Sequence, residues 1–206
     1  ALDKSGRTYR VNEGDGAFYG PKIDFHIRDA LNRTWQCGTI QLDMALPEKF
    51  DLEYTDSEGG RPRPVMLHRA ILGSVERFFG ILIEHFSGRF PLWISPLQVR
   101  LLTVADRHQP YADELAKKIR DAGFYCDVDH ASESVSKKVR NAQLAQINYI
   151  LTIGDKEVEN QTFNLRTRDN VVHGEMQLEA FLDAIIKEKN ERRLTSSFTS
   201  QAEPKP

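Results

Sequence analysis

The sequence predicts an α/β protein in two parts: an α+β part built on an antiparallel sheet, then a part in which strands and helices alternate. The first part is rich in glycine and aromatic residues, and its alternating apolar positions, such as Ile23, Phe25 and Ile27, are typical of an antiparallel sheet that faces a core on one side. The alternation in the second part favours a parallel or mixed sheet covered by helices. Because the run FPLWISP at 90–96 interrupts both patterns, we expect the domain boundary between residues 92 and 93.

The first part ends in a predicted strand and helix. Residues 63–73 carry the strand pattern, and the helix begins at Ser74, a residue type that caps helix N-termini well. The helix ends near His85. Apolar residues recur on one of its faces at the spacing of an amphipathic helix. They are Val75, Phe78, Phe79, Leu82 and Ile83.

The second part contains further strand and helix patterns in alternation. Strands are expected at 99–104, 125–129, 149–154 and 162–168, and helices at 110–122, 134–146 and 178–186. Gly123 is placed to end the first of these helices. Beyond residue 190 charged residues, and then Ser, Thr and Pro, replace the apolar pattern, so we expect residues 191–206 to be a disordered tail.

Composition excludes several classes of protein. The formal net charge is -2, so contact with a nucleic acid would have to come from a local patch rather than from overall charge. Cys37 and Cys126 lie far apart and fit neither a disulfide framework nor a paired-cysteine zinc site, and we expect two buried thiols in a reducing compartment. No apolar run approaches the ~20 residues that span a bilayer, and the start lacks the layout of a signal peptide. We expect a cytoplasmic protein without membrane contact, cut from something longer.

Two segments of the first part carry residues suited to chemistry. In residues 15–24, glycines beside an aromatic residue and Lys22 would let the backbone approach a charged ligand, although such glycines also make simple turns. In residues 64–77 a strand leads into a helix whose first turn carries Arg77, a favourable place to hold a phosphate. The alternative is that Arg77 pairs with a nearby acid such as Glu76. His68, inside an apolar run, is by pattern alone a core histidine more readily than a metal ligand.

The second part offers one basic helix. The run KKVRNAQLAQ at 137–146 places Lys137, Arg140 and Asn141 near the start of a predicted helix, with Val139 and Ala142 turned toward the core. Arginine and asparagine donate well to phosphates and to the edges of unpaired bases. A solvated basic face is the alternative.

Three blocks together identify a resemblance. GAFYGPKID at 16–24, WQCGTIQLD at 35–43 and HRAILGSVER at 68–77 resemble threonyl-tRNA synthetases in wording, order and spacing, and residues 64–77 resemble motif 3 of class II synthetases. The resemblance implies that residues 1–92 are the end of a catalytic domain and that residues 93–190 are an anticodon-binding domain with a mixed five-stranded sheet. It also implies activation of L-threonine with ATP and Mg²⁺, followed by transfer to tRNA-Thr.

The resemblance also implies roles for single residues. Those that match the family's ATP and adenylate positions are Arg77, Lys22 and Gln36. Those that match positions around threonine and its adenylate are Tyr19, Thr39, Gln41 and Ser74. Those that match anticodon contacts are Arg140, Asn141, Glu157 and Arg166.

His68 matches one of three protein ligands of the family's Zn²⁺, which binds the amino and hydroxyl groups of threonine and so rejects valine. The other two ligands, with motifs 1 and 2, are expected before residue 1. One imidazole alone holds zinc weakly, and an activation site without motif 2 is incomplete. We therefore expect this chain to be inactive by itself, and a homodimer only for the intact enzyme.

Two alternatives remain open on the sequence. The chain would be a non-catalytic tRNA-binding module if a synthetase-like domain had been recruited as a sensor, but such a module has little reason to keep Lys22 and Arg77 in working form. It would serve another amino acid if it resembled the prolyl-, histidyl- or glycyl-tRNA synthetases of the same class. His68 favours the threonine enzyme, because a zinc ligand at this point of motif 3 is particular to it.

Overall fold

The structure, a computed structural model, describes residues 2–198 and divides the chain into two compact units, Ala1–Phe86 and Ser87–Pro206. The division lies six residues before the boundary that the sequence suggested, because residues 87–92 pack with the second unit. Phe90, for example, accepts hydrogen bonds from Asn148 and Arg168. Among the described helices, none combines the length and the apolar character needed to cross a membrane.

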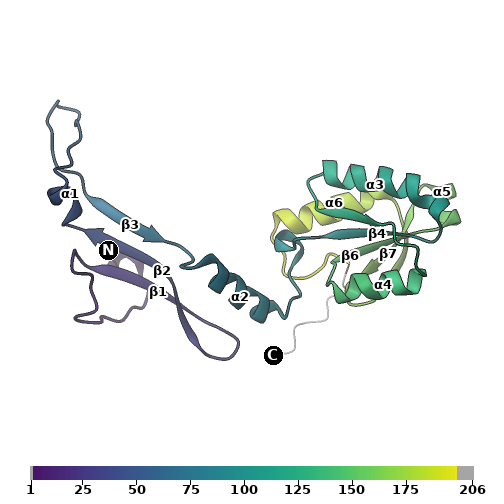
Figure 1. The fold of residues 1–206 in the computed structure, drawn as a ribbon, viewed down its shortest axis with the longest axis horizontal. Coiled ribbons are helices and arrows are strands. Elements are labelled where there is room, and N and C mark those ends of the chain that lie inside the picture. The colour runs from purple at the N-terminus through teal and green to yellow at the C-terminus, as the bar shows by residue number, and fades with distance from the viewer. Residues whose placement is uncertain (1, 199–206) are drawn as a thin grey trace. The chain divides into compact units, whose positions relative to one another are not determined.

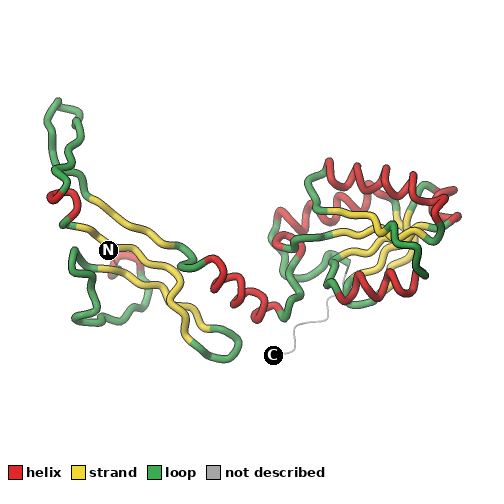
Figure 2. The backbone as a smooth tube through the Cα atoms, viewed as in Figure 1, coloured by secondary structure: helices red, strands yellow, loops and turns green. Residues whose placement is uncertain are grey.

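The first unit is built on a three-stranded antiparallel sheet in the order β1-β2-β3 (Figure 1). A short 3-10 turn, η1, precedes the sheet, helix α1 follows β2, and helix α2 follows β3 (Figure 2). The bounds are η1 Asp3–Ser5, β1 Lys22–Arg28, β2 Thr34–Asp43, α1 Leu46–Lys49, β3 Met66–Ala70 and α2 Val75–Phe86.

Asp29 holds the turn between β1 and β2. Its buried carboxylate accepts hydrogen bonds from the backbone N–H of Leu31 and Arg33, and from the side chains of Arg33 and Trp35. Burial alone would raise the pKa of this carboxyl, but the Trp35 and Arg33 donors outweigh burial and lower the pKa to about 2. The turn therefore keeps a charged anchor at neutral pH.

The apolar faces of the first unit are more open than the sequence suggested. Phe25 is 49% exposed, and on α2 Val75, Phe79 and Ile83 are 65%, 53% and 41% exposed, while Ile81 is buried. Alternation along a strand reports which residues share a face, not what covers that face. The expectation that this sheet faces a core on one side is corrected for the described residues.

The second unit is a five-stranded mixed sheet in the order β5-β4-β6-β7-β8 (Figure 1). β5, β4 and β6 run parallel, and β7 and β8 are antiparallel to their neighbours. Helices α3 and α6 cover one face and α4 covers the other. The bounds are η2 Leu92–Ile94, β4 Val99–Thr103, η3 Asp106–His108, α3 Gln109–Asp121, β5 Cys126–Asp129, α4 Val135–Leu144, β6 Tyr149–Ile153, α5 Asp155–Asn160, β7 Phe163–Thr167, β8 Val172–Met176 and α6 Leu178–Asn190. The fold class is as predicted.

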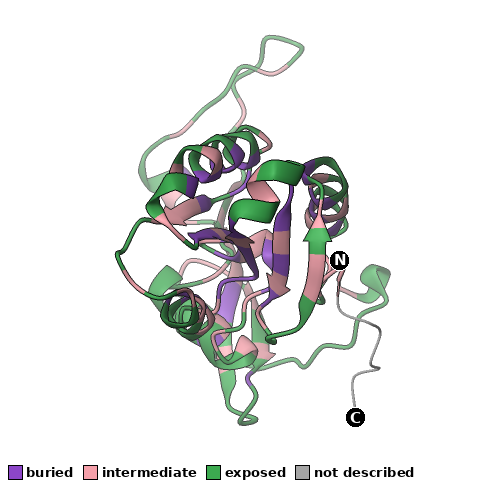
Figure 3. Ribbon diagram, turned by 90° about the vertical axis from the view of Figure 1, so that its right-hand side faces the viewer, coloured by how far each residue is buried: buried purple, intermediate pink, exposed green. Residues whose placement is uncertain are grey.

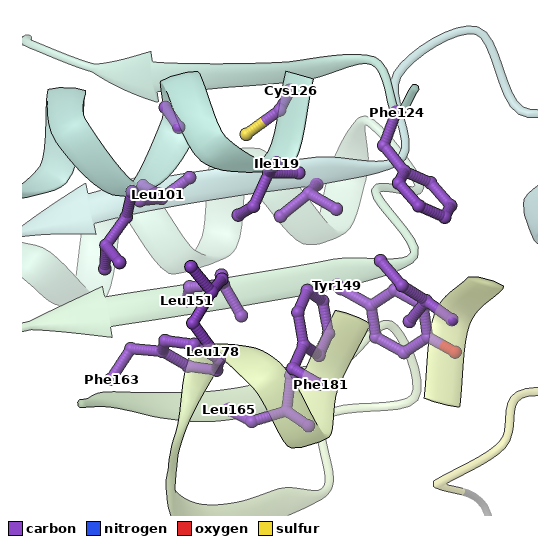
Figure 4. Close-up of a cluster of buried hydrophobic side chains, with 14 of the residues drawn as sticks. Leu101, Ile119, Phe124, Cys126, Tyr149, Leu151, Phe163, Leu165, Leu178 and Phe181 are labelled. Carbon is purple, nitrogen blue, oxygen red and sulfur yellow. The ribbon is translucent and has the colours of Figure 1, made fainter. Parts of the chain in front are cut away.

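The main core lies between this sheet and helices α3 and α6 (Figures 3 and 4). Tyr149, Phe163 and Phe181 are completely buried there, with the Phe181 ring 5.4 Å from each of the other two. Cys126 lies at the edge of this cluster, and burial raises the pKa of its thiol to about 12. Cys37, in the first unit, is also buried and free, so the prediction of two buried thiols is confirmed.

The segment after α6 packs on the core instead of leaving it. Tyr149 donates a hydrogen bond to Glu188, 2.6 Å away, and the backbone N–H of Ser197 donates to the same oxygen at 2.7 Å. Phe198 stacks on Phe181. The predicted tail began at residue 191, but buried partners hold its first residues, a long-range effect that composition does not reveal. Residues 199–206 lie outside the described part of the chain.

Candidate active site and nucleic-acid interface

Cross-strand pairing places four predicted site residues on one face of the first sheet. Lys22 lies opposite Gln41, which lies opposite His68; one rung further, Asp24 lies opposite Thr39. Directly opposed residues of antiparallel strands project to the same side of a sheet. We call this surface the polar face: Lys22, Asp24, Gln36, Thr39, Gln41, Asp43 and His68.

Asp24 contacts three other residues of the polar face. Its Oδ1 accepts hydrogen bonds from Gln36 at 2.7 Å and Thr39 at 2.8 Å, and its Oδ2 pairs with the Lys22 ammonium at 3.0 Å. Burial alone would raise the pKa of Asp24, but Thr39 and Lys22 lower it, and Asp24 in turn raises the pKa of Lys22. Gln36 reaches this face because a β-bulge shifts the pairing beyond Phe25.

Tyr19 and Asp43 complete the other end of the polar face. The Tyr19 hydroxyl donates to Gln41 Oε1 at 2.9 Å, and the Tyr19 ring lies 6.0 Å from the His68 ring, centroid to centroid. Asp43 Oδ2 lies 2.8 Å from His68 Nε2. Burial alone would raise the pKa of Asp43, but the backbone N–H of Leu46 and the His68 ring outweigh it and lower the pKa. His68 is 41% exposed, so it is not a core histidine.

A glycine turn places the N-terminus of α2 beside β2. Gly73 has a φ of +67°, and a Cβ there would lie 3.2 Å from the carbonyl oxygen of Cys37, so the turn requires glycine. Ser74 follows directly, and its Oγ accepts a hydrogen bond from Arg77 N at 3.4 Å. Ser74 also donates to Glu76 at 2.7 Å. Glu76 is thereby engaged, and no carboxylate in residues 2–198 forms an ion pair with the Arg77 guanidinium.

The first unit also contains a groove of about 1110 Å³ beside β1. Its lining includes residues 7–12 and, on β1, Lys22 and Asp24. Over residues 2–198 there is no group of three His, Cys, Asp or Glu side chains that would hold a metal ion. Asp43 and His68 therefore form a pair, not a complete metal site.

In the second unit, Arg166 lies on the face of the sheet that α4 covers. On β7 it lies opposite Ile150 of the neighbouring strand β6, and Ile150 packs under α4. Arg166 donates to Asn170 Oδ1, and Gln143 of α4 donates to the same oxygen at 2.7 Å. The three residues join the strand, the β7–β8 turn and α4 into one polar surface.

The other predicted anticodon residues lie on α4 and at the start of α5. Arg140 and Asn141 are exposed on α4, and Asn141 donates to Glu133 at 3.4 Å. Glu157 accepts a hydrogen bond from the backbone N–H of Gly154 and so caps α5, after the end of β6. Arg166 pairs near the start of β6. Along β6, about four residues, or roughly 13 Å, separate the position opposite Arg166 from the end of the strand where Glu157 lies. A ligand that contacts both Arg166 and Glu157 is therefore longer than one base.

Sequence patterns missed several residues of these surfaces. Asp24 and Asp43 stand at alternate positions with the predicted residues of their strands, and that alternation was the available signal. Lys138 looked like part of the basic run but is 3% exposed, and its ammonium binds the carbonyl oxygens of Thr103 and Asp129. Asn170 carried no signal, because only the folded turn brings it to Arg166.

Both units match known families. Residues 3–86 match the tRNA synthetase class II core domain (G, H, P, S and T), and residues 98–188 match the anticodon binding domain. The end of a core domain followed by an anticodon-binding domain defines the C-terminal region of a class II aminoacyl-tRNA synthetase.

The relatives include threonine–tRNA ligases. The chain is 72% identical over 200 residues to the threonine–tRNA ligase of Protochlamydia amoebophila and 60% identical over 195 residues to that of Chlamydia felis, which covers 97% and 95% of this chain and 31% of each relative. A crystal structure of the RNA binding domain of threonyl-tRNA synthetase from Cryptosporidium parvum superposes with a TM-score of 0.81 at 41% identity, over 96% of this chain and 49% of that one. The chain belongs to the threonyl-tRNA synthetase family and spans about 31% of the length of these ligases.

Proposed function

We propose that this chain is the part of a threonine–tRNA ligase that forms one wall of the amino-acid activation site and reads the anticodon. The observation that carries the proposal is the polar face, on which Lys22, Gln41 and His68 stand in one rung and Asp24 and Thr39 in the next. Residues far apart in the sequence converge there on one surface, next to a helix N-terminus that carries Arg77. Such convergence of polar groups is what a substrate site requires.

ATP with Mg²⁺ is the proposed energy source, and Arg77 is the proposed phosphate clamp. Its guanidinium has no ion-pair partner among the described residues, and it stands in the first turn of α2, where the helix dipole favours an anion. A planar donor fork stabilises charge that develops on the phosphates. Lys22 and Gln36 would hold the nucleotide and adenylate from the sheet, with Asp24 fixing both side chains.

Threonine is the proposed amino acid. Tyr19, Thr39, Gln41 and Ser74 would surround it and its adenylate, and His68 would contribute one ligand to a Zn²⁺ ion that binds its hydroxyl and amino groups. The half-exposed His68 ring, with one nitrogen held by Asp43, suits one ligand of such a set. The remaining ligands are expected from outside the described residues. A site that coordinates a hydroxyl rejects valine strongly, because an apolar pocket alone discriminates weakly.

tRNA-Thr is the proposed macromolecular partner. Arg140, Asn141 and Arg166 would donate to the bases and phosphates of the anticodon loop, and Glu157 would accept from a base amino group. Their distribution over α4, β7 and the start of α5 supports a ligand of several unpaired nucleotides. A homodimer of the intact enzyme and a cytoplasmic location complete the proposal, and the two free cysteines support the latter.

A chimera tests the proposal. We expect this chain alone to form no threonyl-adenylate above background, because the other walls of the site lie outside it. Placed in the Protochlamydia amoebophila ligase in exchange for the matching region, it should restore ATP–pyrophosphate exchange with threonine and the charging of tRNA-Thr. A stably folded chimera that binds tRNA-Thr but activates no amino acid would favour the non-catalytic module instead.

A further inference from the structure

Asp43 is a charged member of the polar face, and both of its carboxylate oxygens are engaged in hydrogen bonds. Its side chain is 1% exposed. One oxygen, Oδ1, accepts hydrogen bonds from the backbone N–H groups of Ala45 and Leu46, both at 2.9 Å, at the point where α1 begins. The other oxygen, Oδ2, lies 2.8 Å from His68 Nε2. The carboxylate therefore has no freedom to turn away from the ring.

The pairing of the strands explains why the two side chains meet. Gln41 lies opposite His68, and Asp43 lies opposite Met66, so Asp43 and His68 are diagonal neighbours on one face of adjacent strands. His68 Nδ1, by contrast, has no hydrogen-bond partner within residues 2–198. The ring is thus anchored through one nitrogen and open at the other.

An ionised carboxylate only accepts hydrogen bonds, so the nitrogen that faces it must carry the proton. We propose that Asp43 is a positioning residue, which holds His68 in the tautomer protonated at Nε2 and so presents the Nδ1 lone pair as a ligand. The inference rests on the proposed role of His68 as a metal ligand, and it names the residue that makes this imidazole fit for that role. Histidine ligands of metals commonly donate their second N–H to a carboxylate in this way.

The replacement Asp43→Asn separates this role from a structural one. The amide oxygen of asparagine still accepts from the backbone of Ala45 and Leu46, so the start of α1 is retained. Its NH₂ group then faces His68 Nε2 and donates to it, which forces the proton onto Nδ1 and removes the ligand lone pair. The shape of the site is unchanged while the proton moves.

The first readout is the tautomer of His68 in this chain, read from long-range ¹H–¹⁵N NMR correlations at about pH 8.5, well above the ordinary imidazole pKa of about 6.5. His68→Gln assigns the signals. We expect protonation at Nε2 in the natural sequence and at Nδ1 in Asp43→Asn. The same tautomer in both proteins, or protonation at Nδ1 in the natural sequence, would overturn the inference.

The second readout is Zn²⁺ affinity, measured by competition with a chromophoric chelator on the chimera. Asp43→Asn should weaken Zn²⁺ binding about 10- to 100-fold. Asp51→Asn, which changes an exposed carboxylate of the same unit that pairs with Arg63 and does not touch His68, should leave the Zn²⁺ affinity unchanged. Equal affinities for Asp43→Asn and the natural sequence would overturn the inference. If the tautomer shifts as expected but the natural chimera binds no Zn²⁺, the metal role in the proposed function fails, while the control of the His68 tautomer by Asp43 stands.

Discussion

Replacing Arg77 with alanine should lower the rate of threonyl-adenylate formation by about 10²- to 10³-fold in the chimera, the usual cost of removing one donor that stabilises developing charge. The guanidinium lies in the first turn of α2 without an ion-pair partner among residues 2–198, so its loss would remove the proposed phosphate contact and would break no salt bridge of the described residues. The measurement is single-turnover adenylate formation at saturating ATP and threonine.

Arg69→Ala is the matched control. Arg69 is exposed on β3 and lies opposite Ile40, which places it on the face of the sheet away from Lys22 and His68. Its removal changes the net charge as Arg77→Ala does. The rate of adenylate formation should stay within about twofold of that of the natural sequence. If both variants lose activity alike, overall charge rather than a phosphate clamp explains the result.

Replacing Phe181 with alanine should destabilise the anticodon-binding unit by about 3–5 kcal/mol. The ring is completely buried, meets Tyr149 and Phe163 edge-on, and stacks on Phe198, 6.0 Å away. Deleting it leaves a cavity at the junction of β6, β7 and α6. The measurement is the free energy of unfolding in urea, followed by the fluorescence of Trp93 after Trp35→Phe has removed the second of the two tryptophans.

Lys187→Ala on the same helix provides the comparison. Lys187 is exposed, and alanine is a strong helix former. The free energy of unfolding of this variant should therefore lie within about 0.5 kcal/mol of the parent's. A loss below about 1 kcal/mol for Phe181→Ala would contradict the packing described for the second unit, because a ring at that position cannot be deleted without a cavity.

The periodic elements of the second unit could be predicted because their apolar spacing is local. Residues 110–122 and 149–154, for example, were placed within one or two residues of α3 and β6. The edge strand β8 and the short helix α5 were missed. Val172 in β8 is 50% exposed and Gly174 interrupts the strand, so β8 shows no alternation of apolar and polar residues. Helix α5 has six residues, too few for apolar residues to recur at helical spacing.

The membership of the polar face could be predicted only in part. The resemblance supplied Lys22, Thr39, Gln41 and His68, and the strand register then placed them in two adjacent rungs. Register depends on which strands pair and where the bulge at Phe25 falls, and neither is written in one strand's own sequence. Asp43 shows the limit, because its role depends on a diagonal contact across two strands.

The measurement that tests the account most directly is the binding of the tRNA-Thr anticodon stem-loop to this chain at two salt concentrations. We expect the cognate loop to bind more tightly than a loop with altered anticodon bases, and Arg166→Ala to weaken cognate binding by about 10- to 100-fold and to reduce the preference. Lys117→Ala, which removes a positive charge on α3 at the opposite face, should change little. Equal, purely salt-dependent binding of both loops, unchanged in Arg166→Ala, would contradict the account of this unit as an anticodon reader.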